Sequence, residues 1–170
     1  MVVTGRNGAG KSSLLRMLAG LVRIPAGRLA LEGGKADIPL AEHTHYIGHQ
    51  DAMKPSLSVE ENLQFWTEFL GGGGQSIEPA LVALNLAPLA RLPAVYLSAG
   101  QRRRLSIARL VAVQRPIWLL DEPTSALEVP SQKNLGELMR GHLAGGGMII
   151  AAAHGPIGLE RARELKLGPE

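Results

Sequence analysis

The sequence predicts an α/β domain with a mainly parallel sheet, and three observations support that prediction. Short apolar strands alternate with helical segments along most of the 170 residues, which is the pattern of βαβ units. A glycine-rich loop, "GRNGAGKSS", joins the first apolar strand to the first helix. The composition is 45% hydrophobic and 19% charged, which is typical of a chain that folds around a buried core.

The first strand is expected at residues 2–4 and the first helix at residues 11–22. The loop between them matches G-x-x-x-x-G-K-[ST], the phosphate-binding loop. Glycines let the backbone curl so that several amide N–H groups point into one small volume, with no Cβ to obstruct a phosphate. The residues expected to bind the nucleotide are Gly5, Asn7, Gly8, Ala9, Gly10, Lys11, Ser12 and Ser13.

Two side chains of this loop have specific chemistry. Lys11 supplies a positive charge to the β- and γ-phosphates of a nucleoside triphosphate, and Ser12 supplies a hydroxyl to Mg²⁺. The positive end of the helix dipole adds to this attraction. The alternative is an ordinary glycine-rich turn before a helix, and the strand at residues 2–4 argues against it.

The pattern between the first helix and residue 54 is weaker. A short strand is expected at residues 28–31 between two turns, and another in "HYIGHQ". His43, His45 and His49 lie in or near that second strand. We expect them to be surface or loop residues rather than metal or haem ligands, because no cysteine or carboxylate completes a ligand set.

Residues 55–114 are almost entirely helical in pattern and predict a separate helical subdomain. Ser58 and Glu61 form a capping box before a helix. The apolar face of that helix is expected to consist of Leu63, Trp66, Phe69 and Leu70. Further helices are expected at residues 79–86 and 100–113.

The C-terminal part returns to the alternating pattern. A helix starts near Pro130 and ends at the glycines of residues 145–147, as proline and glycine preferences predict. Two buried strands and a last short strand are expected at residues 117–120, 148–152 and 164–167. We therefore expect one α/β core formed by residues 1–54 and 115–170.

Composition and length exclude several classes of protein. The chain has no cysteine, so it forms neither disulfides nor cysteine–zinc sites. Its longest apolar stretches, such as residues 116–120 and 148–153, are too short to cross a bilayer. The net charge of +3 fits nucleic acid, an acidic membrane surface or a nucleotide pocket, and does not choose among them.

Two acidic residues end the strand in "IWLLDEP". Asp121, at the C-terminal end of the strand, can hold Mg²⁺ directly or through water, opposite Ser12. Glu122 faces a different direction and can act as general base for a water that attacks the γ-phosphate. The alternative is that Asp121 and Glu122 are ordinary surface acids. The presence of a phosphate loop in the same chain argues against that interpretation.

A second helix start suited to anions occurs at "LSAGQ", since a helix N-terminus attracts negative charge. The candidate residues of this loop are Ser98, Ala99, Gly100 and Gln101, which follow Leu97. Arg102, Arg103 and Arg104 follow it directly. From the residues alone, these arginines indicate a solvated helix face, with nucleic-acid contact as the weaker alternative.

The loop "LSAGQ", its arginine-rich helix and "LLDEPTSALE" together resemble an ABC-type ATPase domain. The resemblance extends from Met1 to about Leu167. It implies a P-loop NTPase core with a helical signature subdomain, ATP and Mg²⁺ as cofactors, and a homodimer that holds ATP head to tail. In such a dimer Ser98 and its loop act in trans, on the γ-phosphate bound by the other subunit's phosphate loop.

The same resemblance implies roles for further residues. Gln50 resembles the glutamine that contacts Mg²⁺ and senses the attacking water, and residues 51–55 would couple to a membrane partner. His154 resembles the switch histidine, which hydrogen-bonds the γ-phosphate. The implied catalytic residues are Glu122, His154 and Gln50. The implied metal ligands are Ser12, Gln50 and Asp121.

Three stretches narrow the resemblance, namely "GHQDAMKPSLSVEENLQFW", "YLSAGQRRRLSIARL" and "AAAHGPIGLERARELKL". They are similar to the ATP-binding subunits of haem exporters in bacterial cytochrome c maturation. The implied protein lies peripherally on the cytoplasmic face of the inner membrane and drives integral-membrane permease subunits. It meets haem only indirectly and does not bind nucleic acid.

Other assignments remain open at this point. They are the ATPase of another ABC transporter, or an ABC-type ATPase that acts on nucleic acid or the ribosome. The second kind usually carries long insertions or tandem domains, which this compact chain lacks. A GTPase would need an N-K-x-D guanine-binding motif, and the sequence has none.

The chain also departs from the family pattern. Arg6 replaces the usual proline of the phosphate loop, and Glu128 replaces the usual aspartate of the loop after Glu122. Family members have strands before the phosphate loop, with an aromatic residue that stacks on adenine. We therefore expect an N-terminally shortened chain that lacks adenine stacking and leaves an open sheet edge beside its first strand.

Overall fold

The computed structural model describes residues 1–33, 38–155, 157–160 and 162–168. The chain forms two compact units. The first unit comprises Met1–His49, Arg115–Pro123 and Gly136–Glu170, and the second comprises Gln50–Gln114 and Thr124–Leu135. Within the described ranges, no helix is both long and apolar enough to span a membrane.

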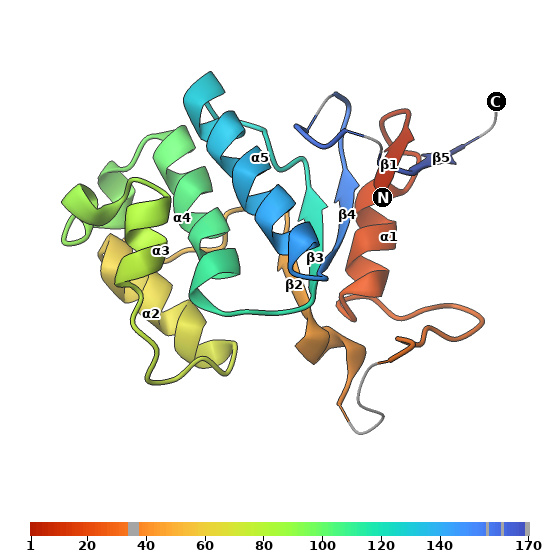
Figure 1. Ribbon diagram of the computed structural model, residues 1–170, viewed down its shortest axis with the longest axis horizontal. Helices are drawn as coiled ribbons and strands as arrows, with labels where there is room; N and C mark the ends of the chain where they lie inside the picture. Colours follow the sequence, from red (N-terminus) through yellow and green to blue (C-terminus); the bar gives the residue numbers. More distant parts are fainter. Residues whose placement is uncertain (34–37, 156, 161, 169–170) are drawn as a thin grey trace. The chain divides into compact units, whose positions relative to one another are not determined.

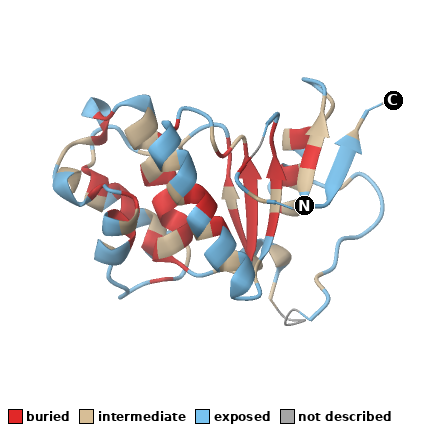
Figure 2. Ribbon diagram, turned by 45° about the horizontal axis from the view of Figure 1, so that its top comes forward, coloured by how far each residue is buried: buried red, intermediate tan, exposed pale blue. Residues whose placement is uncertain are grey.

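A parallel sheet forms the centre of the first unit (Figure 1). In the described part of the chain its order is β2-β3-β4-β1-β5, and all neighbouring pairs are parallel. The strands are β1 (Val2–Gly5), β2 (Thr44–Ile47), β3 (Ile117–Asp121), β4 (Met148–Ala152) and β5 (Glu164–Leu167). Figure 2 shows β3 buried along its length, whereas β5 is mostly exposed. The mainly parallel sheet that the alternating pattern predicts is confirmed.

Helix α1 (Lys11–Leu18) follows β1 and packs on one face of the sheet. Its Leu15 belongs to the same buried cluster as Val3 of β1. The helix ends earlier than predicted because Gly20 has a φ of 72°, a left-handed conformation that commonly ends helices. Leu21, which falls within the predicted helix, therefore lies beyond its end and is 62% exposed.

Strand β1 is not at the edge of the sheet. Val2 is in register with Ala151 of β4 on one side, and Gly5 is in register with Leu167 of β5 on the other. The expected open edge beside the first strand is therefore wrong, because the chain's own β5 covers it. Strand β5 forms the edge of the sheet on this side, and a charge such as that of Lys166 disfavours pairing with further strands there.

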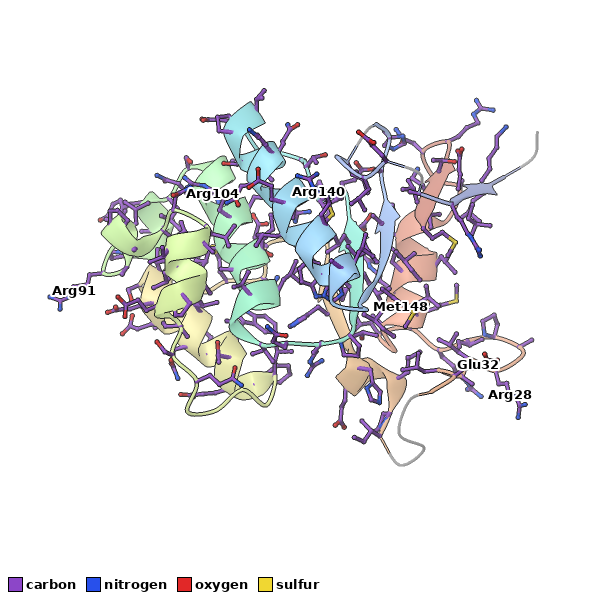
Figure 3. All side chains as sticks on the ribbon, in the orientation of Figure 1. Arg28, Glu32, Arg91, Arg104, Arg140 and Met148 are labelled. Carbon is purple, nitrogen blue, oxygen red and sulfur yellow. The ribbon has the colours of Figure 1, made fainter. Side chains whose placement is uncertain are left out.

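The segment at residues 28–31 does not form the expected strand. Its first three residues are exposed, and Leu31 packs against the buried cluster of the first unit. Figure 3 shows Arg28 and Glu32 pointing away from this loop. Residues 28–31 therefore contact the first unit through the side chain of Leu31 rather than through strand pairing. The turn expected after it continues into Gly34, which lies outside the described residues.

Helices form the second unit. They are α2 (Val59–Phe69), α3 (Glu78–Ala83), α4 (Ala99–Ala112) and the part of α5 (Val129–Ala144) up to Leu135. The capping box predicted at the start of α2 is present. Ser58 Oγ accepts a hydrogen bond from Glu61 N at 3.1 Å, and Glu61 Oε2 accepts one from Ser58 N at 2.7 Å.

The apolar face predicted for α2 is only partly buried. Leu63 is fully buried, but Phe69 is 70% exposed; its ring stacks on Phe65 and contacts Trp66 edge to face. Thr67 is almost fully buried instead, and its hydroxyl donates to Leu63 O at 2.9 Å. The local hydrogen bond lets a threonine occupy a buried position that the apolar pattern does not include.

Candidate functional site

The loop between β1 and α1 turns at glycines. Gly5, Gly8 and Gly10 have φ values of 144°, 81° and 97°, which residues with a side chain rarely adopt. Gly10 is also the N-cap of α1, and no side chain caps the helix there. The helical bond from Leu14 N to Gly10 O is 2.8 Å long. The amides of residues 11–13 precede it and have no acceptor within the helix.

Gly5 is required for a second reason. A Cβ at this position would lie 2.5 Å from Leu167 O of β5, which is well inside van der Waals contact. The motif spacing identifies Gly5 as a phosphate-loop glycine. Its close approach to β5 depends on strand pairing, which the spacing does not reveal.

Lys11 is 8% exposed, and its ammonium group turns back onto the loop. Nζ donates to Gly5 O at 2.8 Å and to Arg6 O at 3.2 Å. Arg6 O also accepts from Ala9 N at 3.1 Å. Arg6 therefore takes part through its backbone, while its side chain is exposed. The result is one positive charge fixed inside the curve of the loop.

A cavity of about 320 Å³ opens at the start of α1. It is lined by Asn7, Gly8, Gly10, Lys11, Ser12, Ser13, Glu122 and His154. The phosphate loop thus meets residues that follow β3 and β4, since the carboxyl ends of parallel strands lie at one edge of a sheet. Gly5 and Ala9, the other two predicted nucleotide-binding residues, are in the loop but do not line the cavity.

Glu122 has a φ of 49°, which is unusual for a residue with a side chain. Its backbone N donates to Ala152 O at 2.9 Å, and this bond ties the turn after β3 to the end of β4. The Oε1 atom lies 3.4 Å from His154 Nε2. Both side chains remain accessible, at 29% and 52% exposure. Strained backbone of this kind is concentrated at functional sites.

Two oxygen donors suited to Mg²⁺ belong to the first unit. The Ser12 residue lines the cavity, and Asp121, 2% exposed, ends β3. A hydroxyl and a carboxylate fit the preference of Mg²⁺ for oxygen ligands together with water and phosphate oxygens. No cluster of three or more His, Cys, Asp or Glu able to hold a metal occurs in the described ranges. Gln50, the third predicted ligand, belongs to the second unit.

The histidines of the "HYIGHQ" region differ from one another. His45 is 2% exposed and lies in β2 in register with Trp118 of β3, so the expected surface or loop position is wrong for it. His49 is exposed after the end of β2. His45 is buried although β2 is an edge strand of the sheet, because it lies beside the fully buried strand β3.

The loop "LSAGQ" begins α4 with a capping box of its own. Ser98 Oγ accepts from Gln101 N at 3.2 Å, and Gln101 Oε1 accepts from Ser98 N at 2.7 Å. A Cβ on Gly100 would lie 3.0 Å from Ala126 O, so the glycine permits a close backbone approach. The helix start is therefore held by its own side chains as well as by neighbouring backbone.

The arginines after this loop do not form a solvated face, so that interpretation is wrong. Arg103 is 3% exposed, and its Nη1 lies 3.4 Å from Asp51 Oδ1. Arg104 Nη1 donates to Leu84 O at 3.0 Å, and Arg102 also donates to a backbone carbonyl. Sequence reasoning missed the burial of Arg103 because arginine is seldom buried and its partner is distant in the chain.

Comparison with protein families matches residues 1–125 to the family described as ABC transporter. Curated relatives are similar over nearly the whole chain. The cytochrome c biogenesis ATP-binding export protein CcmA of Rhodopseudomonas palustris (strain BisB5) is 61% identical, and that of Nitrobacter winogradskyi is 60% identical. Each match covers 99% of this chain and 84% of the relative.

Solved structures share the fold. The ATP-binding cassette MJ0796, solved as a dimer in a post-hydrolysis state with ADP and Pi, has a TM-score of 0.78 at 25% identity. The match covers 91% of this chain and 74% of that one. An ATP-binding subunit of an ABC transporter has a TM-score of 0.79 at 24% identity. This match covers 91% of this chain and 68% of that one.

Proposed function

Because the chain belongs to the ABC transporter family, we propose that it is the ATP-hydrolysing subunit of an exporter that serves cytochrome c biogenesis. The observation that carries the proposal is the cavity at the start of α1, where Lys11, Glu122 and His154 line one space. The names of the curated relatives favour this export system over other ABC ATPases. Haem is the cargo, and the ATPase reaches it only through its membrane partners.

ATP binding in this proposal rests on the phosphate loop. The open amides at the start of α1 and the helix dipole attract the β- and γ-phosphates. Lys11 adds a charge-assisted contact to them. The nucleotide-binding residues are Gly5, Asn7, Gly8, Ala9, Gly10, Lys11, Ser12 and Ser13. The position of Lys11 Nζ, 2.8 Å from Gly5 O, supports its role because the charge already lies within the loop.

Hydrolysis in this proposal uses the residues that follow β3 and β4. Glu122 takes a proton from a water as its oxygen attacks the γ-phosphorus, while the bond from that phosphorus to the ADP oxygen breaks. His154 donates a hydrogen bond to the γ-phosphate, and its approach to Glu122 at 3.4 Å lets each orient the other. Ser12, Asp121 and Gln50 would hold Mg²⁺, which neutralises charge on the phosphates when bound.

A homodimer completes the site in this proposal. The signature residues Ser98, Ala99, Gly100 and Gln101 act in trans on ATP held by the partner's phosphate loop. The dimeric state of the MJ0796 cassette with ADP and Pi supports this arrangement. We also propose that residues 1–54 and 115–170 act as the ATPase core and residues 55–114 as the helical subdomain.

The proposed location is the cytoplasmic face of the bacterial inner membrane, where the protein binds integral-membrane permease subunits peripherally. Residues 51–55, after Gln50, would transmit the ATPase cycle to those subunits. The curated relatives are named as export proteins, and an export ATPase needs such partners to form the path through the membrane.

Reconstitution with the membrane partners tests the proposal. The tagged protein is purified together with the permease subunits encoded in its source genome and is placed in lipid vesicles. We expect Mg²⁺-dependent ATP hydrolysis that rises several-fold over that of the purified chain alone. Association with ribosomes or DNA instead of the permease subunits, or hydrolysis unaffected by them, would contradict the proposal.

A further inference from the structure

Two arginines of α4 are buried next to the segment that follows Gln50. Arg103 and Arg109 are 3% and 5% exposed, although arginine is almost never buried without a partner. Arg103 pairs with Asp51 at 3.4 Å. The guanidinium of Arg109 lies over the ring of Trp66, 4.5 Å from its centroid. All of these residues belong to the second unit.

Trp66 extends this contact to the same segment. Its Nε1 donates to Ala52 O at 2.8 Å. Ala52 has a φ of 48°, a conformation that a residue with a Cβ keeps only where its surroundings hold it. The backbone next to Gln50 is therefore held by Arg103 through Asp51, and by Arg109 through Trp66.

A third contact fixes the end of the segment. Lys54 N donates to Asn62 Oδ1 at 2.8 Å, and Asn62 Nδ2 donates to Lys54 O at 3.0 Å. Asn62 is 2% exposed, so these bonds are shielded from water. Residues 51–54 are thus attached to α2 and α4 at successive points along the chain.

The negative charge of Asp51 acts on both buried arginines, Arg103 and Arg109. Burial lowers the pKa of Arg109 to about 10, Asp51 raises it and Arg103 lowers it. Arg109 therefore stays charged at neutral pH, and two buried cations share the field of one carboxylate. If Asp51 moved away, both buried cations would lose the stabilisation that this carboxylate gives them, which is unfavourable at buried sites.

We propose that Arg103 and Arg109 are positioning residues for Gln50, because they fix its segment to α4 through Asp51 and through Trp66. The inference rests on the proposed function, in which Ser98 at the start of α4 acts in trans and Gln50 acts in cis. One helix then serves both ATP sites of the dimer. It presents Ser98 to the partner's nucleotide and sets the position of Gln50 at its own.

Removing the charge of Asp51 tests the functional part. In Asp51→Asn we expect kcat for ATP hydrolysis to fall about tenfold while KM changes less than about twofold, because misplaced catalytic groups cost rate. Asp51→Glu, which keeps the charge, should recover most of the rate. Adding Arg103→Gln to Asp51→Asn should lower kcat by no more than about twofold further, because both changes break the same tie.

Two variants control for loss of stability. Arg104→Gln changes an arginine of the same helix that bonds Leu84 O and Asn85 O instead; Figure 3 labels it. Ile107→Val trims a buried residue of α4 and should lower Tm. Both should keep kcat within about twofold of the parent once it is normalised to folded protein. Suppose that Asp51→Asn and Ile107→Val lower Tm equally. If Asp51→Asn then lowers kcat no more than Ile107→Val does, the loss follows from reduced stability and the proposal is overturned.

Fluorescence of Trp66 tests the attachment without any activity. The chain has two tryptophans, and Trp118→Phe leaves Trp66 as the only one. In that background, Asp51→Asn should shift Trp66 emission to longer wavelength and raise its acrylamide quenching about twofold, while Arg104→Gln should do neither.

The two readouts separate the possible failures. Unchanged Trp66 emission in Asp51→Asn overturns the attachment, whatever the protein hydrolyses. A parent that hydrolyses no ATP together with its membrane partners defeats the proposed function, and the fluorescence result still decides whether Asp51 holds the segment. A clear fluorescence change with unchanged kcat overturns the positioning role.

Discussion

Helices α1 and α4 both begin at loops that suit an anion, but they satisfy their first amides differently. At α1 the N-cap is Gly10, and no side chain caps the helix. At α4 the N-cap is Ser98, whose hydroxyl accepts from Gln101 N. The first amides of α1 are therefore left open to an external acceptor, whereas at α4 one of the first amides, that of Gln101, is already satisfied by the N-cap side chain.

The difference indicates a division of work between the two loops. Glycines at positive φ shape the first loop, and its Lys11 supplies a buried charge. The second loop has no lysine, and the O–H of its Ser98 hydroxyl can still donate to a phosphate while the oxygen accepts from Gln101 N. The first loop can hold a triphosphate alone, while the second suits a contact to a nucleotide that is already bound elsewhere.

The largest expected effect is the loss of ATP affinity when the charge of Lys11 in the first loop is removed. Lys11→Ala removes charge-assisted contacts to two phosphates, worth about 1.5–3 kcal/mol each, so ATP affinity should fall by a factor of about 100 or more. Equilibrium binding of a fluorescent ATP analogue measures the loss. Lys133→Ala, at an exposed position of α5, is the control. Binding by Lys11→Ala at the parent's affinity would remove the basis of the comparison.

The second-largest effect is expected on the rate of ATP hydrolysis in the cavity at the start of α1, after ATP has bound. Glu122→Gln should slow ATP hydrolysis by about 100-fold, because a general base contributes factors of about 10²–10⁴, and should leave affinity nearly unchanged. Single-turnover hydrolysis measures this rate. Glu137→Gln on the exposed side of α5 should behave like the parent. Equal turnover in Glu122→Gln and the parent would show that another group takes the proton.

The two capping boxes allow a direct test of the α4 loop. Ser98→Ala and Ser58→Ala each remove an N-cap hydroxyl and should each cost about 1 kcal/mol of stability, measured by urea unfolding. Only Ser98→Ala should also lower kcat, by about tenfold. Equal kcat values in the two variants would mean that Ser98 is a structural cap and nothing more.

The smallest expected effect is a pH dependence confined to the first unit. The ring of His142 stacks on Trp118 with centroids 3.9 Å apart, and burial lowers the pKa of His142 from an ordinary value of about 6.5. The unfolded chain then takes up the proton at higher pH than the folded chain. Stability is lost as pH falls below about 6.5.

Amide hydrogen exchange measures this pH effect by region. On acidification, protection of β3 and β4 should decrease in the parent and decrease less in His142→Phe, while α4 should respond equally in both. His49→Phe, at an exposed position, should match the parent. A loss of protection in β3 and β4 that is the same in the parent and in His142→Phe would assign the effect to other groups.

Much of the fold could be predicted because local signals are strong where strands and helices alternate. The strands around Leu119 and Ile149 are short apolar runs, and the capping boxes at Ser58 and Ser98 mark helix starts. The strand expected at residues 28–31 was wrong because a short apolar run forms a strand only if a partner lies beside it. That partner cannot be read from the run itself.

The sequence alone predicted the phosphate loop and the order of the motifs proposed to be catalytic, because these depend on residue types at fixed short spacing. Tertiary structure decided how residues distant in the chain meet, as Gly5 with Leu167 and Glu122 with His154. It also decided that Arg103 is buried against Asp51. Burial and pairing over long separations depend on the packing of whole elements, and no local pattern encodes which charged side chain that packing will enclose.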